Sequence, residues 1–252
     1  MKIDVKSLKK NRWNLHINNT DRPLVFLGSN IVMEKFSDLC EEFGIEILGI
    51  IDKDYWGNTD KICDIPVIGS EDNIEEFKDY NFFCATNWLP MSDPVSQRDR
   101  EKRFRLIDII KNNNLNCISL VDPTARVSRS ATVGKNVFID AHVLIESKVQ
   151  IGDFTSLYGR VQIGHNTIVK NNCVLQRDAG LAAKQTVEDN VFFGCGVRAL
   201  KTNVIFGENS FIHELVYIKR GTVPNEVVSF YDYNKKRVER PYRSEYCDNQ
   251  ES

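Results

Sequence analysis

Four histidines are the residues of this chain best suited to transfer a proton near neutral pH: His16, His142, His165 and His213. An imidazole with an unperturbed pKa near 6.5 can take a proton from an attacking amine or hydroxyl. His165 differs from the others because it follows Ile163 in the tetrapeptide I-G-H-N, and Ile163 belongs to a regular six-residue repeat. Whether this ring can act as a base therefore depends on the secondary structure that positions it.

Metal and thiol chemistry find little support in the residue spacing. His142, His165 and His213 contain no close pair such as H-x-x-x-x-H, so we expect no metal site. The seven cysteines are odd in number, lack a C-x-x-C pair and often fall in apolar strand patterns, which indicates reduced core thiols. Cys173 and Cys195 have no histidine nearby in the sequence, so we interpret both as packing residues.

A six-residue period organises the second half of the sequence. Every sixth residue from Val127 to Leu175 is Val, Ile or Leu, giving nine consecutive aliphatic positions. Gly134, Gly152 and Gly164 each follow such a position by one residue, where we expect a turn with positive φ. A period of six fits a hexapeptide solenoid and fits neither an α-helix nor an alternating strand.

Each hexad of such a solenoid makes one short strand and one turn, and three hexads close a triangular coil. Stacked coils pair as parallel strands about 4.8 Å apart, so the aliphatic residues form continuous columns. The columns continue to Phe193 and then slip by one residue, which predicts an insertion in a turn near Thr202. His165 would lie at the edge of a coil face, where its ring could reach a groove between neighbouring subunits.

The first half of the chain predicts a parallel sheet. Residues 24–27 are a short apolar run ending in Gly28, a helical pattern continues to Gly44, and residues 45–51 form a second buried run ending in Asp52. Further strands are expected at residues 65–68, 82–85 and 117–121, with helices at 72–77 and 98–111. This β-α-β pattern indicates a small Rossmann-like domain.

Ligands of open parallel sheets bind beyond the carboxyl ends of the strands. The candidate substrate-binding residues at that edge are Gly28, Ser29, Asn30, Asp52 and Asn87. The turn has one glycine where G-x-G-x-x-G has three, so a dinucleotide along the usual loop is not expected. A plain tight turn at Gly28 and a helix cap or solvated turn at Asp52 are the structural alternatives.

Residues 121–139, V-D-P-T-A-R-V-S-R-S-A-T-V-G-K-N-V-F-I, resemble the start of the β-helix of hexapeptide acyltransferases. The order of a small Rossmann-like domain, D-P-T-A and the solenoid is similar to that of the sialic-acid and bacillosamine-type sugar acyltransferases, over about residues 23–230. The resemblance implies an α/β Rossmann-like domain followed by an all-β left-handed parallel β-helix. It also implies transfer of an acyl group, usually acetyl from acetyl-CoA, to an amine or hydroxyl of a nucleotide-linked sugar.

The resemblance assigns roles to three residues. His165 stands where the family's I-x-H-[DE] motif places its catalytic histidine, which implies a general base for direct attack on the thioester. The family follows this histidine with Asp or Glu, whereas this chain has Asn166, an amide that can bond the ring without charge. Glu146 is expected one coil away, beside His165, and is the candidate carboxylate for orienting the ring.

In that family CoA lies along the groove beside the later coils, which implies a donor site. The candidate residues for it are Gly180, Ala182, Ala183, Lys184, Arg198 and Lys201. The small residues would leave room for the thioester arm, and the basic ones could meet the phosphates. Acetyl-CoA is thus a co-substrate and no cofactor is bound permanently. The family's active sites lie between prisms, which implies a homotrimer, and its N-terminal domain holds the nucleotide-sugar.

Composition narrows the remaining classes. A net charge of −2 and a pI near 6.1 give no electrostatic signature for binding nucleic acid. No apolar run approaches eighteen residues and the N-terminus has no apolar signal-like stretch, so we expect no membrane insertion and a cytoplasmic location. We expect an arm or edge strand at 1–22, the nucleotide-sugar domain at 23–121, the acyltransferase β-helix at 122–228, and a cap and tail at 229–252.

A rival interpretation is a non-catalytic nucleotide-sugar-binding or scaffolding homologue. Asn166 favours it, and so does Val174, which stands where the family carries a second histidine facing CoA. The sequence leaves open the identity of the sugar and its nucleotide, N- against O-acylation, and the nature of the acyl group.

Overall fold

The computed structural model of the chain describes residues 21–30, 32–86 and 94–229. The chain divides into two compact units. The first comprises the described chain up to Pro123 together with Val133–Ile139, and the second comprises Thr124–Thr132 and the described chain from Asp140 onward. Most of the expected arm, nearly all of the expected tail, and the candidate residue Asn87 lie outside the described residues.

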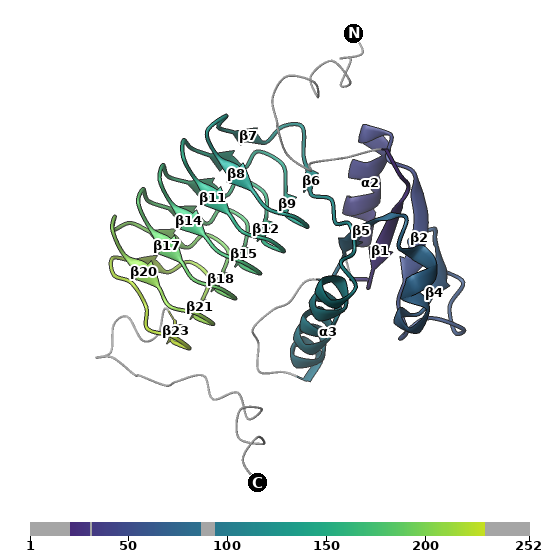
Figure 1. Cartoon of the computed structure of the whole chain (residues 1–252). Coiled ribbons are helices and arrows are strands. Elements are labelled where there is room, and N and C mark those ends of the chain that lie inside the picture. Colours follow the sequence, from purple (N-terminus) through teal and green to yellow (C-terminus); the bar gives the residue numbers. More distant parts are fainter. Residues whose placement is uncertain (1–20, 31, 87–93, 230–252) are drawn as a thin grey trace. The chain divides into compact units, whose positions relative to one another are not determined.

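The first unit is built on a sheet with strand order β3-β4-β2-β1-β5, in which β3 alone runs antiparallel to its neighbour (Figure 1). The parallel β-α-β arrangement predicted from the sequence is confirmed. The elements are β1 (Leu24–Leu27), α2 (Met33–Phe43), β2 (Ile47–Ile51), β3 (Lys61–Ile62), β4 (Ile65–Gly69), the 3-10 helix η1 (Glu71–Phe77), β5 (Asn81–Cys84) and α3 (Pro94–Asn112). Among the described residues, no helix has the length and apolar character needed to cross a membrane.

Burial and capping explain these elements. All four residues of β1 are buried because this strand lies between β2 and β5 at the centre of the sheet. The helix α2 ends at Gly44, which adopts a left-handed φ of 63° and donates its backbone N–H to the last turn. Phe36 of α2 packs edge-on against Phe83 of β5, with 5.1 Å between ring centroids. The buried face of the helix is therefore joined directly to the sheet.

The last strand predicted for this sheet, at residues 117–121, divides into two parts. Cys117 makes an isolated parallel bridge to Phe82 of β5. The next residues form β6 (Leu120–Val121), which pairs instead with β9 (Phe138–Ile139). The chain thus leaves the sheet after one residue and begins the coil pattern three residues later, at Leu120.

From Arg126 onward the chain is a parallel β-helix of two-residue strands, one per hexad (Figure 1). Face 1 contains β7 (Arg126–Val127), β10 (Leu144–Ile145), β13 (Gln162–Ile163), β16 (Gly180–Leu181), β19 (Arg198–Ala199) and β22 (Tyr217–Ile218). Face 2 contains β11 (Gln150–Ile151), β14 (Ile168–Val169), β17 (Thr186–Val187) and β20 (Ile205–Phe206). Face 3 contains β12 (Ser156–Leu157), β15 (Val174–Leu175), β18 (Phe192–Phe193), β21 (Phe211–Ile212) and β23 (Val227–Val228); β8 (Thr132–Val133) precedes β9 in the chain.

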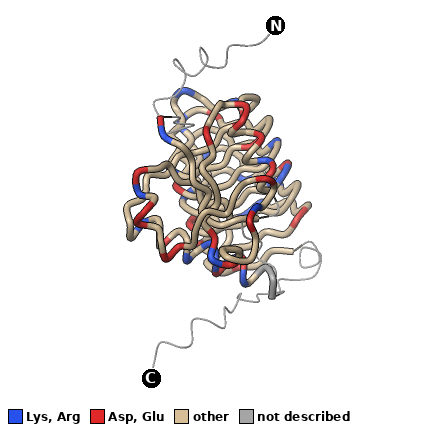
Figure 2. The backbone as a smooth tube through the Cα atoms, turned by 90° about the vertical axis from the view of Figure 1, so that its right-hand side faces the viewer, with Lys and Arg blue, Asp and Glu red and all other residues tan. Residues whose placement is uncertain are grey.

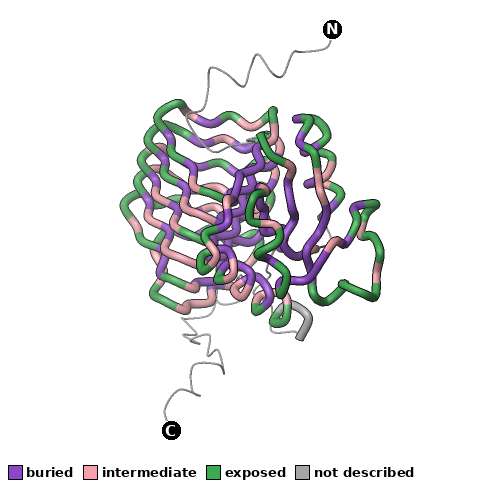
Figure 3. The backbone as a smooth tube through the Cα atoms, turned by 45° about the vertical axis from the view of Figure 1, so that its right-hand side comes forward, coloured by how far each residue is buried: buried purple, intermediate pink, exposed green. Residues whose placement is uncertain are grey.

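The aliphatic columns lie inside the coils, as predicted. All nine positions from Val127 to Leu175 are buried, and so are those that follow as far as Ile218. Figure 3 shows the resulting alternation of buried and exposed backbone along each coil. Leu144 pairs with Gln162, eighteen residues further on, whereas Arg198 pairs with Tyr217, nineteen residues further on. The predicted one-residue insertion therefore lies between Arg198 and Tyr217.

The Gln185 side chain hydrogen-bonds backbone carbonyls at the insertion. It occupies an inward position that small residues fill in most other hexads, and it is only 1% exposed. Its Nε2 donates to the carbonyl oxygens of Ala199 at 3.0 Å and of Lys201 at 2.7 Å. The Ala199 carbonyl also accepts the backbone N–H of Ala182 at 2.9 Å, so it is the bond to the Lys201 carbonyl that gives the longer turn a partner it would otherwise lack.

The positive-φ position of each turn is not where the glycines predicted it. It lies three residues after the column residue, and its occupants include Asn136, Phe154, Asn166 and Leu215. Gly152 and Gly164 have no positive φ. A Cβ on Gly152 would lie 2.6 Å from the backbone carbon of Lys170, and one on Gly164 would lie 2.6 Å from the backbone nitrogen of Ala183. These glycines allow adjacent coils to approach each other.

Two ion pairs join residues of neighbouring coils. Arg160 donates two hydrogen bonds of 2.7 Å to Asp178, eighteen residues on, and Lys170 pairs with Glu188 at the same interval. Figure 2 shows the two signs interspersed along the described chain. The hydrogen bond from Arg160, together with its charge, lowers the pKa of the Asp178 carboxyl below its ordinary value. Such exposed pairs add little stability each.

We expect Gly152→Ala to destabilise the second unit by about 1–3 kcal/mol, because its new methyl would overlap the backbone of the next coil. The lowered unfolding midpoint should be measurable by circular dichroism during heating. Gly159→Ala is the matched control, since its Cβ would have its nearest neighbour, an oxygen of Asp140, at an ordinary 3.5 Å. Equal midpoints for the two variants would contradict this account of the glycines.

Candidate active site

His165 lies at the corner where face 1 turns into face 2. It follows β13 by two residues, and Asn166 occupies the positive-φ position of the same corner with φ of 57°. Asparagine tolerates this conformation well, which gives Asn166 a local structural reason for its place. The ring of His165 is half-buried on the outside of the coil, and no core position holds it. The corner therefore presents the imidazole at the surface of the β-helix.

The imidazole is held by its neighbour in the sequence. Nδ1 of His165 lies 2.7 Å from Nδ2 of Asn166. In this amide orientation Nδ1 accepts the bond, and a neutral ring then carries its proton on Nε2. When the amide is rotated by 180°, Oδ1 accepts a hydrogen bond from Nδ1–H, and the lone pair on Nε2 is then available to act as a base. The amide orientation therefore determines which nitrogen can react.

Glu146 lies beside His165 one coil earlier but contacts its backbone. Its Oε2 accepts a hydrogen bond of 2.8 Å from the backbone N–H of His165. The backbone N–H of Glu146 in turn donates to the carbonyl of Ile163 at 3.0 Å. Glu146 therefore anchors the corner that carries the histidine, whereas the bond to the ring comes from Asn166.

The candidate donor-site residues lie on the two coils that follow His165. The backbone N–H of Lys184 donates to the carbonyl of His165 at 2.9 Å, which places Ala182, Ala183 and Lys184 on the same corner one coil on. Gly180 and Arg198 point outward from face 1, and a Cβ on Gly180 would lie 2.4 Å from Nη1 of Arg198. Lys201 is exposed at the insertion. These residues form one strip of surface beginning at the histidine.

The carboxyl edge of the first unit's sheet holds the other candidate group. Gly28 follows β1 with φ of 75°, and a Cβ there would lie 2.6 Å from both Leu106 of α3 and Thr86. The glycine therefore makes room for α3 as well as for the turn. Asn30 braces the same turn, because its Nδ2 donates to the carbonyl of Ala85 and its Oδ1 accepts from the backbone N–H of Val32 at 2.6 Å.

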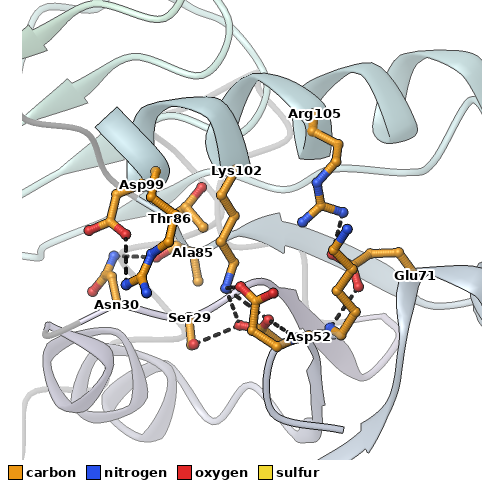
Figure 4. Close-up of polar contacts among 12 residues, drawn as sticks. Ser29, Asn30, Asp52, Glu71, Ala85, Thr86, Asp99, Lys102 and Arg105 are labelled. Atoms are coloured by element: carbon orange, nitrogen blue, oxygen red, sulfur yellow. Dashed lines mark hydrogen bonds and ion pairs between the residues drawn. The ribbon is translucent and has the colours of Figure 1, made fainter. Parts of the chain in front are cut away.

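Asp52 is the centre of a buried polar cluster at this edge (Figure 4). It is 0% exposed, and Lys102 of α3 donates to its two oxygens at 2.8 and 2.7 Å. The Ser29 hydroxyl also donates to Oδ2 at 2.7 Å, and the backbone N–H of Asp54 donates to Oδ1 at 3.1 Å. Both oxygens of Asp52 are thus engaged by the protein itself.

Lys102 was not identified from the sequence, although it joins two carboxylates of this cluster, those of Asp52 and Asp54. It is 9% exposed and also lies 2.9 Å from Oδ2 of Asp54. Burial lowers the pKa of Lys102, but hydrogen bonds to Asp52 and Asp54 outweigh it and raise the pKa above its ordinary value. Burial raises the pKa of Asp54, yet the bond and charge of Lys102 leave it lowered overall. A second ion pair, between Arg105 and Glu71 at 2.8 Å, lies on the same edge (Figure 4).

The described part of the chain offers little for metal or thiol chemistry. No group of three or more His, Cys, Asp or Glu side chains there could hold a metal ion. Cys173 is fully buried, and burial raises the pKa of its thiol to about 12. A protonated thiol at that depth is a poor nucleophile at neutral pH.

Comparisons with known proteins first define the class of fold. Residues 142–177 match the family of bacterial transferase hexapeptide (six repeats). Together with the sheet order above, this confirms an α/β Rossmann-like unit followed by a left-handed parallel β-helix. The matched segment contains His142, Glu146, His165 and Asn166.

Two solved structures share this arrangement over most of the chain. PerB from Caulobacter crescentus, in complex with CoA and GDP-perosamine, is 19% identical with a TM-score of 0.70, over 81% of this chain and 92% of that one. The same protein is described elsewhere as perosamine N-acetyltransferase. WeeI from Acinetobacter baumannii AYE is 12% identical with a TM-score of 0.65, over 82% of this chain and 96% of that one. At these identities the likeness establishes a shared fold.

We expect Lys102→Met to destabilise the first unit by about 3–5 kcal/mol, because it would leave the Asp52 carboxylate buried without a cation. Urea unfolding at pH 7 measures the loss. Arg98→Met is the control, since Arg98 is exposed and its carboxylate neighbour Asp99 lies at 3.5 Å. We expect that control to change stability by less than about 0.5 kcal/mol.

The pKa directions set the pH range of this stabilisation. The pKa of Lys102 is raised above 10.5, so its contribution is complete below that pH and is lost as the pH rises through the folded pKa. The pKa of Asp54 is lowered below 3.8, so its contribution is complete above that pH and is lost as the pH falls through the folded pKa. The difference between wild type and Lys102→Met should therefore narrow toward both extremes, and a difference independent of pH would contradict the assignment.

Proposed function

We propose that this chain is an acyl-CoA-dependent sugar acyltransferase of the cytoplasm. The acyl group, acetyl in the simplest case, passes from CoA to an amine or hydroxyl of a sugar that is linked to a nucleotide. The observation that carries the proposal is the outward corner of the hexapeptide β-helix. There the His165 ring is bonded by Asn166 at 2.7 Å and adjoins a strip of small and basic residues on the following coils.

His165 acts as the general base in this proposal. An acceptor hydroxyl is a poor nucleophile and an amine is mostly protonated at neutral pH, so attack on the thioester carbonyl requires a group that removes a proton. In the reactive tautomer Nδ1 keeps its proton and donates a hydrogen bond to Oδ1 of Asn166, which leaves the lone pair on Nε2. The C–S bond breaks as the new C–N or C–O bond forms, and thiolate leaves directly, without a covalent intermediate on the protein.

The donor and acceptor assignments follow from different parts of the chain. Gly180, Ala182 and Ala183 give a surface without bulky side chains beside His165, which suits a pantetheine arm. Lys184, Arg198 and Lys201 offer cations for the CoA phosphates. The first unit would hold the nucleotide of the acceptor at its carboxyl edge. The fold shared with PerB, whose structure contains CoA and GDP-perosamine, supports this division.

A non-catalytic binding protein is the second candidate, and two observations favour it. The partner of the His165 ring is an amide, which cannot stabilise an imidazolium by charge. Glu146, the nearest carboxylate considered for that role, bonds the backbone N–H instead of the ring. In that case the chain would bind CoA or a sugar nucleotide without turnover.

We expect His165→Ala to lower kcat by about 10²–10⁴ while leaving the KM for acetyl-CoA nearly unchanged, because general-base catalysis contributes about that much. Release of CoA thiol in the presence of a panel of nucleotide-linked amino sugars measures the rate. His142→Asn is the matched control, since His142 is also an exposed corner residue and asparagine tolerates its φ of 58°. A His165→Ala protein that retains more than about a third of the wild-type rate would remove the base from the mechanism.

Asn166 supplies a finer test of the same mechanism. A carboxylate in its place can only accept a hydrogen bond from Nδ1–H. This fixes the reactive tautomer, and the negative charge stabilises the imidazolium. We therefore expect Asn166→Asp to maintain or raise kcat and to raise the pKa seen in the pH profile of kcat/KM. Asn166→Ala should lower kcat, and an unchanged profile in both variants would show that the amide does not orient the ring.

We also propose a homotrimer, because a thioester on the flat side of one prism would have only a single protein wall. Exposed Leu215 and Tyr217 at face 1 suit contact with a second copy. We expect light scattering to give three times the chain mass of 29.0 kDa. A stable monomer under dilute native conditions would contradict the trimer and a site shared between subunits.

A further inference from the structure

The polar residues expected to bind the nucleotide are engaged inside the first unit. Both oxygens of Asp52 accept bonds from Lys102, and Ser29 donates its hydroxyl to the same carboxylate. Both polar atoms of the Asn30 amide bond backbone groups. These residues brace the edge of the sheet (Figure 4). Ligand contacts must come from neighbouring groups that are still available.

Asp54, two residues beyond Asp52, is such a group. Its side chain is 46% exposed and its Oδ2 is fixed by Lys102 at 2.9 Å. Its Oδ1 has no hydrogen-bond partner among the described residues. Because Lys102 keeps this carboxyl ionised, Asp54 presents a free, oriented acceptor at the carboxyl end of β2.

Two aromatic rings follow on the same turn. Tyr55 and Trp56 are 39% and 49% exposed, and they are the exposed large hydrophobic side chains of the first unit within the described chain. Their backbone N–H groups donate to the carbonyl of Asp52 at 3.1 and 3.0 Å, so the turn is closed. The Lys102 ammonium lies 5.5 Å from the centre of the Tyr55 ring. The rings are thus held on an ordered turn beside the free carboxylate oxygen.

We propose that residues 54–56 bind the nucleoside of the acceptor, with Asp54 accepting a hydrogen bond from the ribose 2′-hydroxyl and Trp56 stacking on the base. In NAD-binding parallel α/β sheets a carboxylate that follows the glycine-rich turn by about 20 residues accepts a hydrogen bond from the ribose 2′-hydroxyl. Asp52 has that place here, but Lys102 and Ser29 occupy its oxygens, so Asp54 takes over the contact. Lys102 is then a positioning residue that turns Oδ1 of Asp54 toward the ligand.

This inference rests on the proposed function, in which the acceptor is a nucleotide-linked sugar, and it names the class of nucleotide. A carboxylate that reads the 2′-hydroxyl selects ribonucleotide-linked sugars over those linked to 2′-deoxyribonucleotides. A site built to bond a hydroxyl discriminates strongly against an analogue that lacks it, because its own polar group is left without a partner.

Calorimetry on the full-length protein with UDP, dUDP, GDP and dGDP tests the carboxylate. For wild type we expect the better-bound ribonucleotide to bind at least about tenfold more tightly than its 2′-deoxy form. Asp54→Asn should remove most of that difference by weakening the ribonucleotide alone. Asp64→Asn is the matched control, because Asp64 is exposed on the β3–β4 hairpin and its φ of 61° suits asparagine.

The stacking contact is tested separately. Trp56→Leu should weaken ribonucleotide and 2′-deoxyribonucleotide by similar factors, about 5- to 100-fold, since base stacking on an aromatic ring does not depend on the sugar. Trp56→Phe should recover most of the affinity. Thermal unfolding midpoints close to wild type would show that these exposed positions are not needed for folding.

Equal affinity of wild type for ribo- and 2′-deoxyribonucleotides would overturn the inference, and so would affinities that Asp54→Asn and Trp56→Leu leave unchanged. If the protein still acetylates a nucleotide-sugar in that case, the proposed function stands and only the inference fails. Absence of nucleotide binding together with thiol release onto a free sugar would overturn both the inference and the nucleotide-linked acceptor. A change of oligomeric state in Trp56→Leu with unaltered nucleotide affinity would identify the rings as a protein contact instead.

Discussion

Backbone hydrogen bonds between one coil and the next are the interaction on which the second unit depends. Its strands are only two residues long, and their partners lie eighteen or nineteen residues away, except that β21 and β23 pair at sixteen. A coil therefore has little stability without its neighbours, as in other solenoids. The candidate base is fixed by one bond of this ladder and by one side chain. The carbonyl of His165 accepts the backbone N–H of Lys184 of the following coil, and the backbone N–H of His165 donates to Oε2 of Glu146 of the preceding coil. The corner is held from both sides before any substrate binds.

The columns of the β-helix could be predicted because burial at one position per hexad requires only an apolar side chain. The turns could not be predicted in the same way. Asparagine is the most frequent residue at their positive-φ position, as at Asn166, but residues such as Phe154 and Leu215 also occupy it, so residue type identifies only some of the turns. Glycine was a misleading guide, since Gly152 and Gly164 are explained by the approach of the next coil. That contact joins residues about eighteen positions apart and has no local pattern in the sequence.

In the candidate sites, too, contacts between residues distant in the sequence could not be predicted. The outward place of His165 follows from its distance to Ile163, which the sequence contains. The partner of Asp52 could not be found in this way, because Lys102 is fifty residues away in the sequence. The helix that carries Lys102 could be predicted, but the direction of this one side chain could not. The ion pair with Lys102 changes the role that can be assigned to Asp52 at the carboxyl edge of the sheet. The acidic residue at the end of β2 becomes part of the protein's own framework, and the neighbouring Asp54 is the carboxylate left for chemistry.

The insertion repaired by Gln185 bears on how such a chain can change during evolution. An extra residue at a coil corner leaves the columns in register, and one longer polar side chain inside the coil bonds the Lys201 carbonyl of the lengthened turn. A deletion or duplication at a corner could therefore be tolerated after a single compensating substitution inside the coil. Lineages could lengthen or shorten these corners while the histidine corner, on an earlier coil, kept its geometry. Variation in length would then accumulate along the later coils, next to the strip proposed to receive CoA, and so bear on the choice of acyl donor.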